Sequence, residues 1–211
     1  MLNCLYRALR LPVIANAAAA ILREADIRGM LDGVLLVIGT NALAAYELEA
    51  GARFAAGLDA TEDIDLSWAA DGTTLALKGG ATNSVFDMHL AAGESLAPLC
   101  LPSQTWLVAG KPVLQTVCAR DGSFARIAAP DPRLFALHKL WLSKQPSRER
   151  RKRAKDRAQG EALLTAIAAN MPHYPMNKDF LLKLPEELRS CLPANLSLEK
   201  ITLPSRRKPS R

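Results

Sequence analysis

The spacing of hydrophobic and polar residues changes along the chain, and this change predicts a mixed fold. Residues 34–38 are a continuous run of apolar, mostly branched side chains, which is typical of a strand buried on both faces. Gly39 and Thr40 end the run, and residues 41–50 are mostly strong helix formers followed by a glycine. Polar and apolar residues then alternate over 63–68, as in a half-buried strand. We therefore expect a strand, a tight turn, a helix and a second strand, in that order.

Further strands are expected in the middle of the chain. Short strand candidates lie at residues 74–78 and 84–90, next to glycine-containing turns. Residues 113–119 and 124–128 are separated by Asp121-Gly122, a pair that favours a hairpin. These segments predict a small mixed sheet. Together with the helices that flank the sheet, they predict an α+β (α/β) fold.

The last third of the chain has helical composition. Residues 131–144 and 149–170 are expected to be helices, with Leu134, Leu137 and Trp141 on one face of the first. We predict three regions: an α/β core at 1–129, a helical portion at 130–203 and a basic disordered tail at 204–211.

An apolar stretch near the N-terminus allows two interpretations. Arg7 and Arg10 precede the apolar residues 11–22, which superficially imitate a signal peptide. The apolar positions also continue at helical spacing into charged residues, and these positions are Ile14, Ala18, Ile21, Leu22 and Ala25. An amphipathic helix explains this spacing better, so we expect a cytoplasmic protein. No apolar run is long enough to cross a membrane.

The positive charge of the chain is concentrated. Seven basic residues fall within 148–157 and four within 206–211, which leaves 16 basic and 19 acidic residues elsewhere. Such segments attract polyanions such as RNA or nucleotide phosphates, although a solvated helix face and tail would give the same pattern. The four cysteines are scattered without a Cys-x-x-Cys pair, so we expect reduced, mostly buried thiols and no zinc site.

Asp63 and Asp65 are the sharpest chemical feature. Residues two apart on a strand project from the same face, so the two carboxylates converge there. Paired carboxylates suit Mg²⁺ (or Mn²⁺), which keeps coordination positions for water and substrate phosphates. Asp87 is the best-placed third carboxylate for a two-metal site. A solvated strand face is the alternative explanation of the pair.

The Gly39-Thr40 turn is the second chemical feature. A glycine that leads from a strand into a helix exposes backbone N–H groups to an anion, and the threonine hydroxyl can donate one more hydrogen bond. Alternatively, Thr40 is an ordinary helix N-cap. The ordered combination of buried strand, Gly-Thr, helix and Asp-x-Asp is more specific than either part.

This combination resembles the core of the polymerase-beta-like nucleotidyltransferase superfamily. The stretch VIGTNALAAYELEAGARFAAGLDATEDIDLSW carries the resemblance, and APDPRLFALHKLWLSKQPSRERRKRAKDRAQGEAL looks like the helical part of its bacterial GSU-type branch. The resemblance implies that Gly39 and Thr40 grip phosphates and that Asp63 and Asp65 bind metal, with Asp87 as the third carboxylate. It also implies an NTP substrate, release of pyrophosphate, and an RNA, protein or small-molecule acceptor.

Two helical residues are further candidates. Related toxins of the abortive-infection type carry a lysine and an aspartate on the helices after the sheet, which makes Lys139 and Asp156 candidates for contact with the triphosphate and for its orientation. Lys139 lies opposite the apolar face of its helix, so an exposed lysine is the alternative, and an ion pair within one helix is the alternative for Asp156. His138 is expected to be a packed or capping residue.

Two other functions remain open. Twenty-two residues separate Thr40 from Asp63, whereas only 21 separate Asp65 from Asp87, which is short for the connection usually found there. Loss of part of the core would leave a catalytically inactive nucleotide- or RNA-binding relative. The chain could also be the toxin of a toxin–antitoxin pair.

Overall fold

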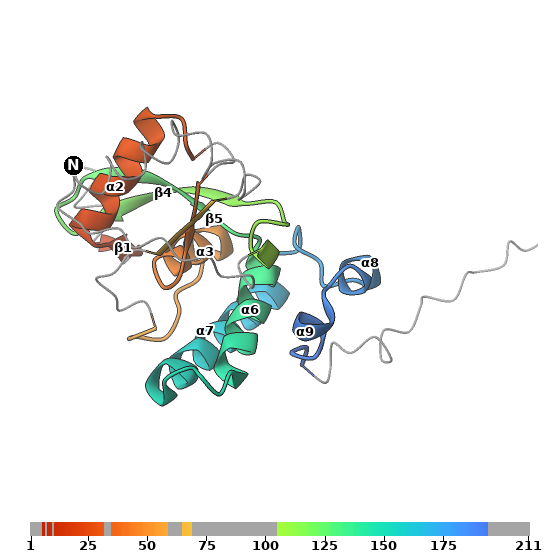
Figure 1. Ribbon diagram of the computed structural model, residues 1–211. Coiled ribbons are helices and arrows are strands. Elements are labelled where there is room, and N and C mark those ends of the chain that lie inside the picture. The colour runs from red at the N-terminus through yellow and green to blue at the C-terminus, as the bar shows by residue number, and fades with distance from the viewer. Residues whose placement is uncertain are drawn as a thin grey trace, which may run out of the picture.

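The computed structural model describes residues 6, 8–9, 11–31, 35–58, 65–68 and 105–193, and at Asp65 and Trp68 only the backbone (Figure 1). The described residues form a mixed α+β fold with a small three-stranded mixed sheet, flanking helices and a helical C-terminal part. This architecture is consistent with a nucleotidyltransferase-like fold and confirms the expected fold class.

A hairpin forms the centre of the three-stranded sheet. Strands β4 (Val113–Ala119) and β5 (Phe124–Ala129) are antiparallel, and β1 (Val13–Ile14) pairs with β4 in parallel. The predicted Asp121-Gly122 turn joins the hairpin, where Gly122 has a φ of 88°. The Asp121 carboxylate accepts hydrogen bonds from the Ser123 N–H and hydroxyl, at 2.9 and 2.7 Å. The predicted hairpin is therefore confirmed.

A second strand pair lies beside this sheet. Strand β2 (Leu35–Ile38) is antiparallel to β3 (Asp65–Trp68) and also contacts β5. All four residues of β2 are buried, as its run of apolar side chains predicts.

Two helices pack on the strands. Helix α2 (Asn16–Ile27) and helix α3 (Ala42–Ala50) both contact β4 and β5. Helix α2 buries the predicted positions Ala18, Ile21, Leu22 and Ala25, but Ile14 belongs to β1. The expectation that Ile14 continues the helical face is wrong, because Ile14 pairs with Ala119 of the sheet.

The helical part follows the hairpin directly. Helix α6 (Pro132–Lys144) begins at Asp131, whose Oδ1 accepts a hydrogen bond from the Arg133 N–H at 2.9 Å. Helix α7 (Arg150–Asn170) runs beside α6, and α8 (Lys178–Leu182) and α9 (Glu186–Arg189) follow (Figure 1). Both predicted long helices are confirmed to within one residue at each end.

Close packing joins α6 to α7 and to the sheet. A Cβ atom on Gly160 of α7 would lie 2.8 Å from the carbonyl oxygen of Ala136 on α6, so the two helices approach more closely than an alanine would allow. The buried Tyr46 of α3 donates its hydroxyl to the carbonyl of Pro130 at 3.0 Å, and its ring packs against Phe135. Because of these contacts, one hydrophobic core extends from the sheet into the helices.

Some expectations lie outside the described residues. These are the strands at 74–78 and 84–90, the tail at 204–211, and Cys4 and Cys100. Cys118 and Cys191 are buried thiols, as expected. The division of the chain at 129 and 203 stays a prediction. Within the described part of the chain, no helix combines the length and apolar character needed to cross a membrane.

Candidate functional site

The turn after β2 contains a glycine in the left-handed conformation. Gly39 has a φ of 72°, which is the left-handed region that favours glycine. Asn41, rather than Thr40, is the N-cap residue of α3. The interpretation of Thr40 as the N-cap is therefore wrong. Gly39 and Thr40 are both partly exposed, so a ligand can reach the turn.

The register of β2 and β3 places the Asp-x-Asp segment at the same turn. Asp65 is the Cα partner of Ile38, the residue directly before Gly39. The carboxyl end of β2 and the start of β3 therefore lie side by side. Only the backbone of Asp65 is described, and Asp63 and Asp87 lie outside the described residues.

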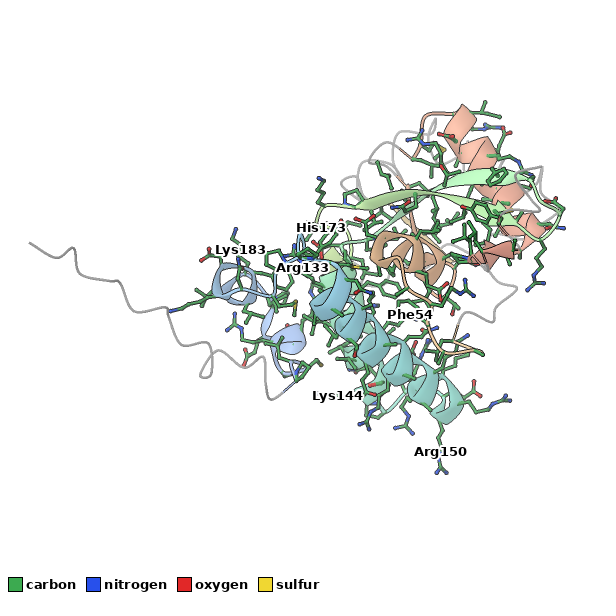
Figure 2. The ribbon with its side chains drawn as sticks, turned by 180° about the vertical axis from the view of Figure 1, so that it is seen from behind. Phe54, Arg133, Lys144, Arg150, His173 and Lys183 are labelled. Atoms are coloured by element: carbon green, nitrogen blue, oxygen red, sulfur yellow. The ribbon has the colours of Figure 1, made fainter. Side chains whose placement is uncertain are left out.

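A buried carboxylate fixes the chain that leaves α3 toward Asp63. Glu47 accepts a hydrogen bond from the Phe54 N–H at 2.6 Å and forms an ion pair with Arg53 at 2.7 Å. Gly51, at the predicted end of α3, has a φ of 58°. Phe54 is labelled in Figure 2. Glu47 thus anchors the first residues of the connection between α3 and β3. Sequence reasoning missed this role.

Lys139 and Asp156 form a buried ion pair between α6 and α7. The Lys139 Nζ donates to Asp156 Oδ1 at 2.9 Å, and Arg148 Nε donates to Asp156 Oδ2 at 2.9 Å. Lys139 is 5% exposed and Asp156 is 3% exposed. Both alternative interpretations are therefore wrong, because Lys139 is not exposed and the partners of Asp156 lie outside its own helix.

Gln159 connects α7 to the Gly39-Thr40 turn. Its Nε2 donates to the carbonyl of Leu58 at 2.7 Å and to the hydroxyl of Thr40 at 3.3 Å. Gln159 lies one helical turn beyond Asp156, on the same side of α7. The structure thereby brings Thr40, Lys139 and Asp156 into one region. Sequence reasoning missed Gln159, although a polar residue at the spacing of Asp156 and Leu163 on one helix face was an available signal.

The basic segment surrounds the start of α7. Four of its residues are exposed, and they are Arg150, Arg151, Lys152 and Arg157. Arg157 pairs with Glu161 at 2.8 Å within the helix. Arg150 projects from the end of α7 that lies farthest from the sheet (Figure 2). The exposure of these four residues is compatible both with a solvated helix face and with the attraction of a polyanion.

His138 is packed among aromatic rings, as expected. Its ring stacks on Trp141 with a centroid separation of 5.9 Å, and Trp106 packs edge-on against both rings. His138 is 6% exposed, and within the described structure its Nε2 has no hydrogen-bond partner. Burial, and secondly the charge of Lys139, lowers the pKa of His138 to about 4. The ring is therefore neutral at pH 7 and is not placed to act as a base.

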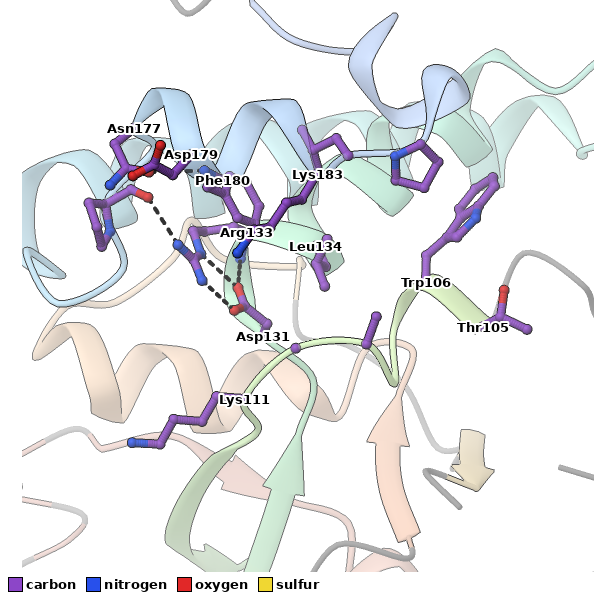
Figure 3. Close-up of a pocket in the computed structure, with 15 residues that line it drawn as sticks. Thr105, Trp106, Lys111, Asp131, Arg133, Leu134, Asn177, Asp179, Phe180 and Lys183 are labelled. Atoms are coloured by element: carbon purple, nitrogen blue, oxygen red, sulfur yellow. Dashed lines mark hydrogen bonds and ion pairs between the residues drawn. The ribbon is translucent and has the colours of Figure 1, made fainter. Parts of the chain in front are cut away.

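A pocket of about 440 Å³ lies elsewhere, between the start of α6 and α8 (Figure 3). Arg133 lies in its wall, donates to both carboxylate oxygens of Asp131 and to the Pro175 carbonyl, and stacks over Phe180. The hydrogen-bonding groups of Arg133 and Asp131 in this wall are thus bonded within the protein. The pocket contains none of the predicted site residues, so we do not assign the chemistry to it.

A comparison with protein families identifies the family of the chain. A family model described as nucleotidyltransferase matches residues 16–99 and 87–182, which together cover well over half of the chain. The chain belongs to this nucleotidyltransferase family. No curated protein and no solved structure matches it.

Membership in the nucleotidyltransferase family confirms the expected superfamily and supports nucleotidyl transfer as the general activity. The matched residues include every predicted site residue, and Asp87 opens the stretch 87–99 that both matched segments share. Among the side chains that the structure describes, no three His, Cys, Asp or Glu residues form a group that could hold a metal ion. The metal ligands proposed below include residues beyond that set.

Proposed function

We propose that this protein is a metal-dependent nucleotidyltransferase that moves a nucleoside monophosphate from an NTP to an acceptor hydroxyl. The observation that carries this proposal is the register of Ile38 with Asp65, which puts the Asp-x-Asp strand beside the Gly39-Thr40 turn. Transfer from a triphosphate requires a turn that binds phosphate and, next to it, carboxylates that bind a cation.

We assign the metal to Asp63, Asp65 and Asp87. These residues supply only carboxylate oxygens, which are the ligands that Mg²⁺ and Mn²⁺ prefer, and the site therefore fits a hard cation. When bound, the cation neutralises charge on the triphosphate and lowers the pKa of the attacking hydroxyl.

We assign the triphosphate to the turn and to the helices. The backbone at Gly39 and the hydroxyl of Thr40 donate to phosphate oxygens. Lys139 carries three donor hydrogens, of which the hydrogen bond to Asp156 uses one, so two remain for phosphate. Asp156 holds Lys139 in place. Arg148 donates a hydrogen bond to the other carboxylate oxygen of Asp156.

The reaction forms one bond and breaks one bond. The acceptor oxygen forms a bond to the α-phosphorus, the bond from that phosphorus to the β-phosphate oxygen breaks, and pyrophosphate leaves with the electron pair. The acceptor proton passes to water. The protein contributes position and electrostatic stabilisation and forms no covalent intermediate.

The acceptor that we favour is RNA. The exposed residues Arg150, Arg151 and Lys152 stand at the start of α7, within two turns of Asp156. A cluster of exposed positive charge beside the site attracts a polyanion more strongly than a neutral acceptor. A protein hydroxyl is the second candidate.

A transfer assay tests the proposal. The full-length protein is incubated with each α-labelled NTP, Mg²⁺ or Mn²⁺, and total cellular RNA and protein. We expect label on RNA with the wild type and none with Asp63→Asn/Asp65→Asn, while circular dichroism shows that the variant is folded. Equal transfer by the variant would refute the assigned carboxylates, and label on protein alone would refute the RNA acceptor.

A further inference from the structure

Gln159 is an enclosed polar residue where three distant segments of the chain meet. The residue is 1% exposed and lies on the inner side of α7. Through Nε2 it contacts Thr40, in the turn after β2, and Leu58, at the end of the described connection toward β3. One amide group therefore joins the phosphate-binding turn, the approach to Asp63 and the helix that carries Asp156.

The carbonyl of Leu58 sets the orientation of this amide. Only the nitrogen of the amide can donate to a carbonyl, so Nε2 must face Leu58 and Oε1 must face away from it. Oε1 is then buried, and no described residue donates a hydrogen bond to it. A buried oxygen without a donor costs stability, so helix packing alone does not account for a glutamine at this position.

The donated hydrogen bond determines what Thr40 can do. A hydroxyl has one hydrogen and two lone pairs, and Nε2 occupies one lone pair. The Thr40 hydrogen therefore points away from Gln159, and among the described residues nothing accepts it. Phosphate oxygens accept hydrogen bonds and cannot donate them when ionised, so a hydroxyl fixed as a donor matches a triphosphate.

We infer that Gln159 is a positioning residue of the nucleotide site, which fixes the Thr40 hydroxyl as a hydrogen-bond donor to the triphosphate. This inference rests on the proposed function and adds that Gln159 orients the Thr40 hydroxyl. Gln159 acts through Thr40 and does not touch the nucleotide. Its bond to Leu58 also ties the turn to the chain that leads to Asp63.

A double-mutant cycle on the full-length protein tests the inference. The variants are Thr40→Val, Gln159→Met and the two together, and the measured quantities are the Kd of Mg²⁺–NTP by calorimetry and the KM and kcat of transfer. We expect Thr40→Val to raise Kd and KM about tenfold with little change in kcat, since a phosphate contact made before and during the reaction is lost. Gln159→Met should have a smaller effect alone and almost none in the Thr40→Val background.

Two further variants separate positioning from general damage. Gln145→Met removes a side-chain amide of the same kind at the end of α6, where Nε2 donates to the Trp141 carbonyl at 3.1 Å. This variant should leave the Kd for NTP unchanged, both in the wild type and in Thr40→Val. Gln159→Glu replaces the donor with a carboxylate that accepts the Thr40 hydrogen. We expect it to raise Kd more than Gln159→Met does, and the effect should weaken as pH falls and the carboxylate is protonated.

The outcomes distinguish the inference from the proposed function. If the wild type binds NTP but the effects of Thr40→Val and Gln159→Met multiply independently, the inference is wrong and the proposed function stands. A wild type that binds no NTP overturns both. If Gln159→Met does not fold, the Gln159→Glu series decides, and a Kd equal to that of the wild type would overturn the inference.

Discussion

Lys139 on α6 and Asp156 on α7 form an ion pair of 2.9 Å, and less than a tenth of either side chain is exposed. Asp156 has a second partner, Arg148, whereas among the described residues Lys139 has no hydrogen-bond partner other than Asp156, and its ammonium lies 5.5 Å from the centroid of the Phe135 ring. Asp156 therefore keeps an ion-pair partner when Lys139 is removed, whereas Lys139 keeps none among the described residues when Asp156 is removed.

This asymmetry predicts the order of two stability losses. Asp156→Asn leaves the Lys139 charge buried without a counter-charge and should lower the free energy of unfolding by about 3–5 kcal/mol. Lys139→Met leaves Asp156 paired with Arg148 and should cost about half as much. Urea unfolding at constant pH measures both values. An equal or larger loss for Lys139→Met would contradict this account of the pair.

His138 should make stability depend on pH. Its pKa falls from 6.5 in the unfolded chain to about 4 in the folded protein, so the unfolded chain binds the proton first as pH decreases. The stability conferred by the neutral ring is complete above pH 6.5 and is lost as pH falls from 6.5 to 4, by about 3 kcal/mol in total.

Unfolding in urea at pH 7.5, 6 and 5, followed by tryptophan fluorescence, tests this dependence. His138→Phe should flatten the decrease between pH 6.5 and 5. His173→Gln is the matched control, because His173 is half-exposed and pairs with Glu49 at 2.6 Å on the surface. A decrease of the same size in wild type and His138→Phe would assign the pH dependence to other groups.

Gly160 should be required for the approach of α7 to α6. The Cβ atom of Gly160→Ala would lie 2.8 Å from both the Ala136 carbonyl oxygen and the Leu140 Cγ, so the helices must separate. We expect a net loss of about 1–3 kcal/mol in spite of the better helix propensity of alanine. The exposed Ala154→Gly, on the same helix, measures the propensity contribution alone. A more stable Gly160→Ala protein would show that the helices tolerate the extra methyl group.

The exposed basic residues at the start of α7 should contribute to RNA binding through charge. Replacing Arg150, Arg151 and Lys152 with glutamine should weaken binding and reduce the slope of log K against log salt by about 2, since each phosphate contact contributes about 0.7 on single strands. Fluorescence anisotropy at several salt concentrations measures the slope. The same substitutions should leave the Kd for NTP unchanged, and an unchanged slope would place the RNA elsewhere.

Local signals were enough to predict much of the fold. The buried run of β2, the turn at Gly39, the Asp121-Gly122 hairpin and the two long helices each depend on residues close together in the sequence. Ile14 was assigned wrongly because its spacing matches the helix that follows, while its strand partner Ala119 lies more than 100 residues away.

The site depends on contacts that no local pattern contains. Lys139 lies opposite the apolar face of α6, which suggested exposure, but α7 covers this side and buries it against Asp156. Gln159 and Thr40 are 119 residues apart, so neither residue indicates the other in the sequence. Asp63 and Asp65, in contrast, were identified from spacing alone, and their role as metal ligands stays a prediction.

The fate of the two ends of the triphosphate tests nucleotidyl transfer most directly. The full-length protein is incubated with Mg²⁺, RNA and the same NTP labelled either at the α- or at the γ-phosphate, and all products are quantified. We predict that the α-label enters the RNA while the γ-label appears in an equal amount of pyrophosphate. Transfer of the γ-label to the acceptor, or release of it as inorganic phosphate without pyrophosphate, would contradict the account.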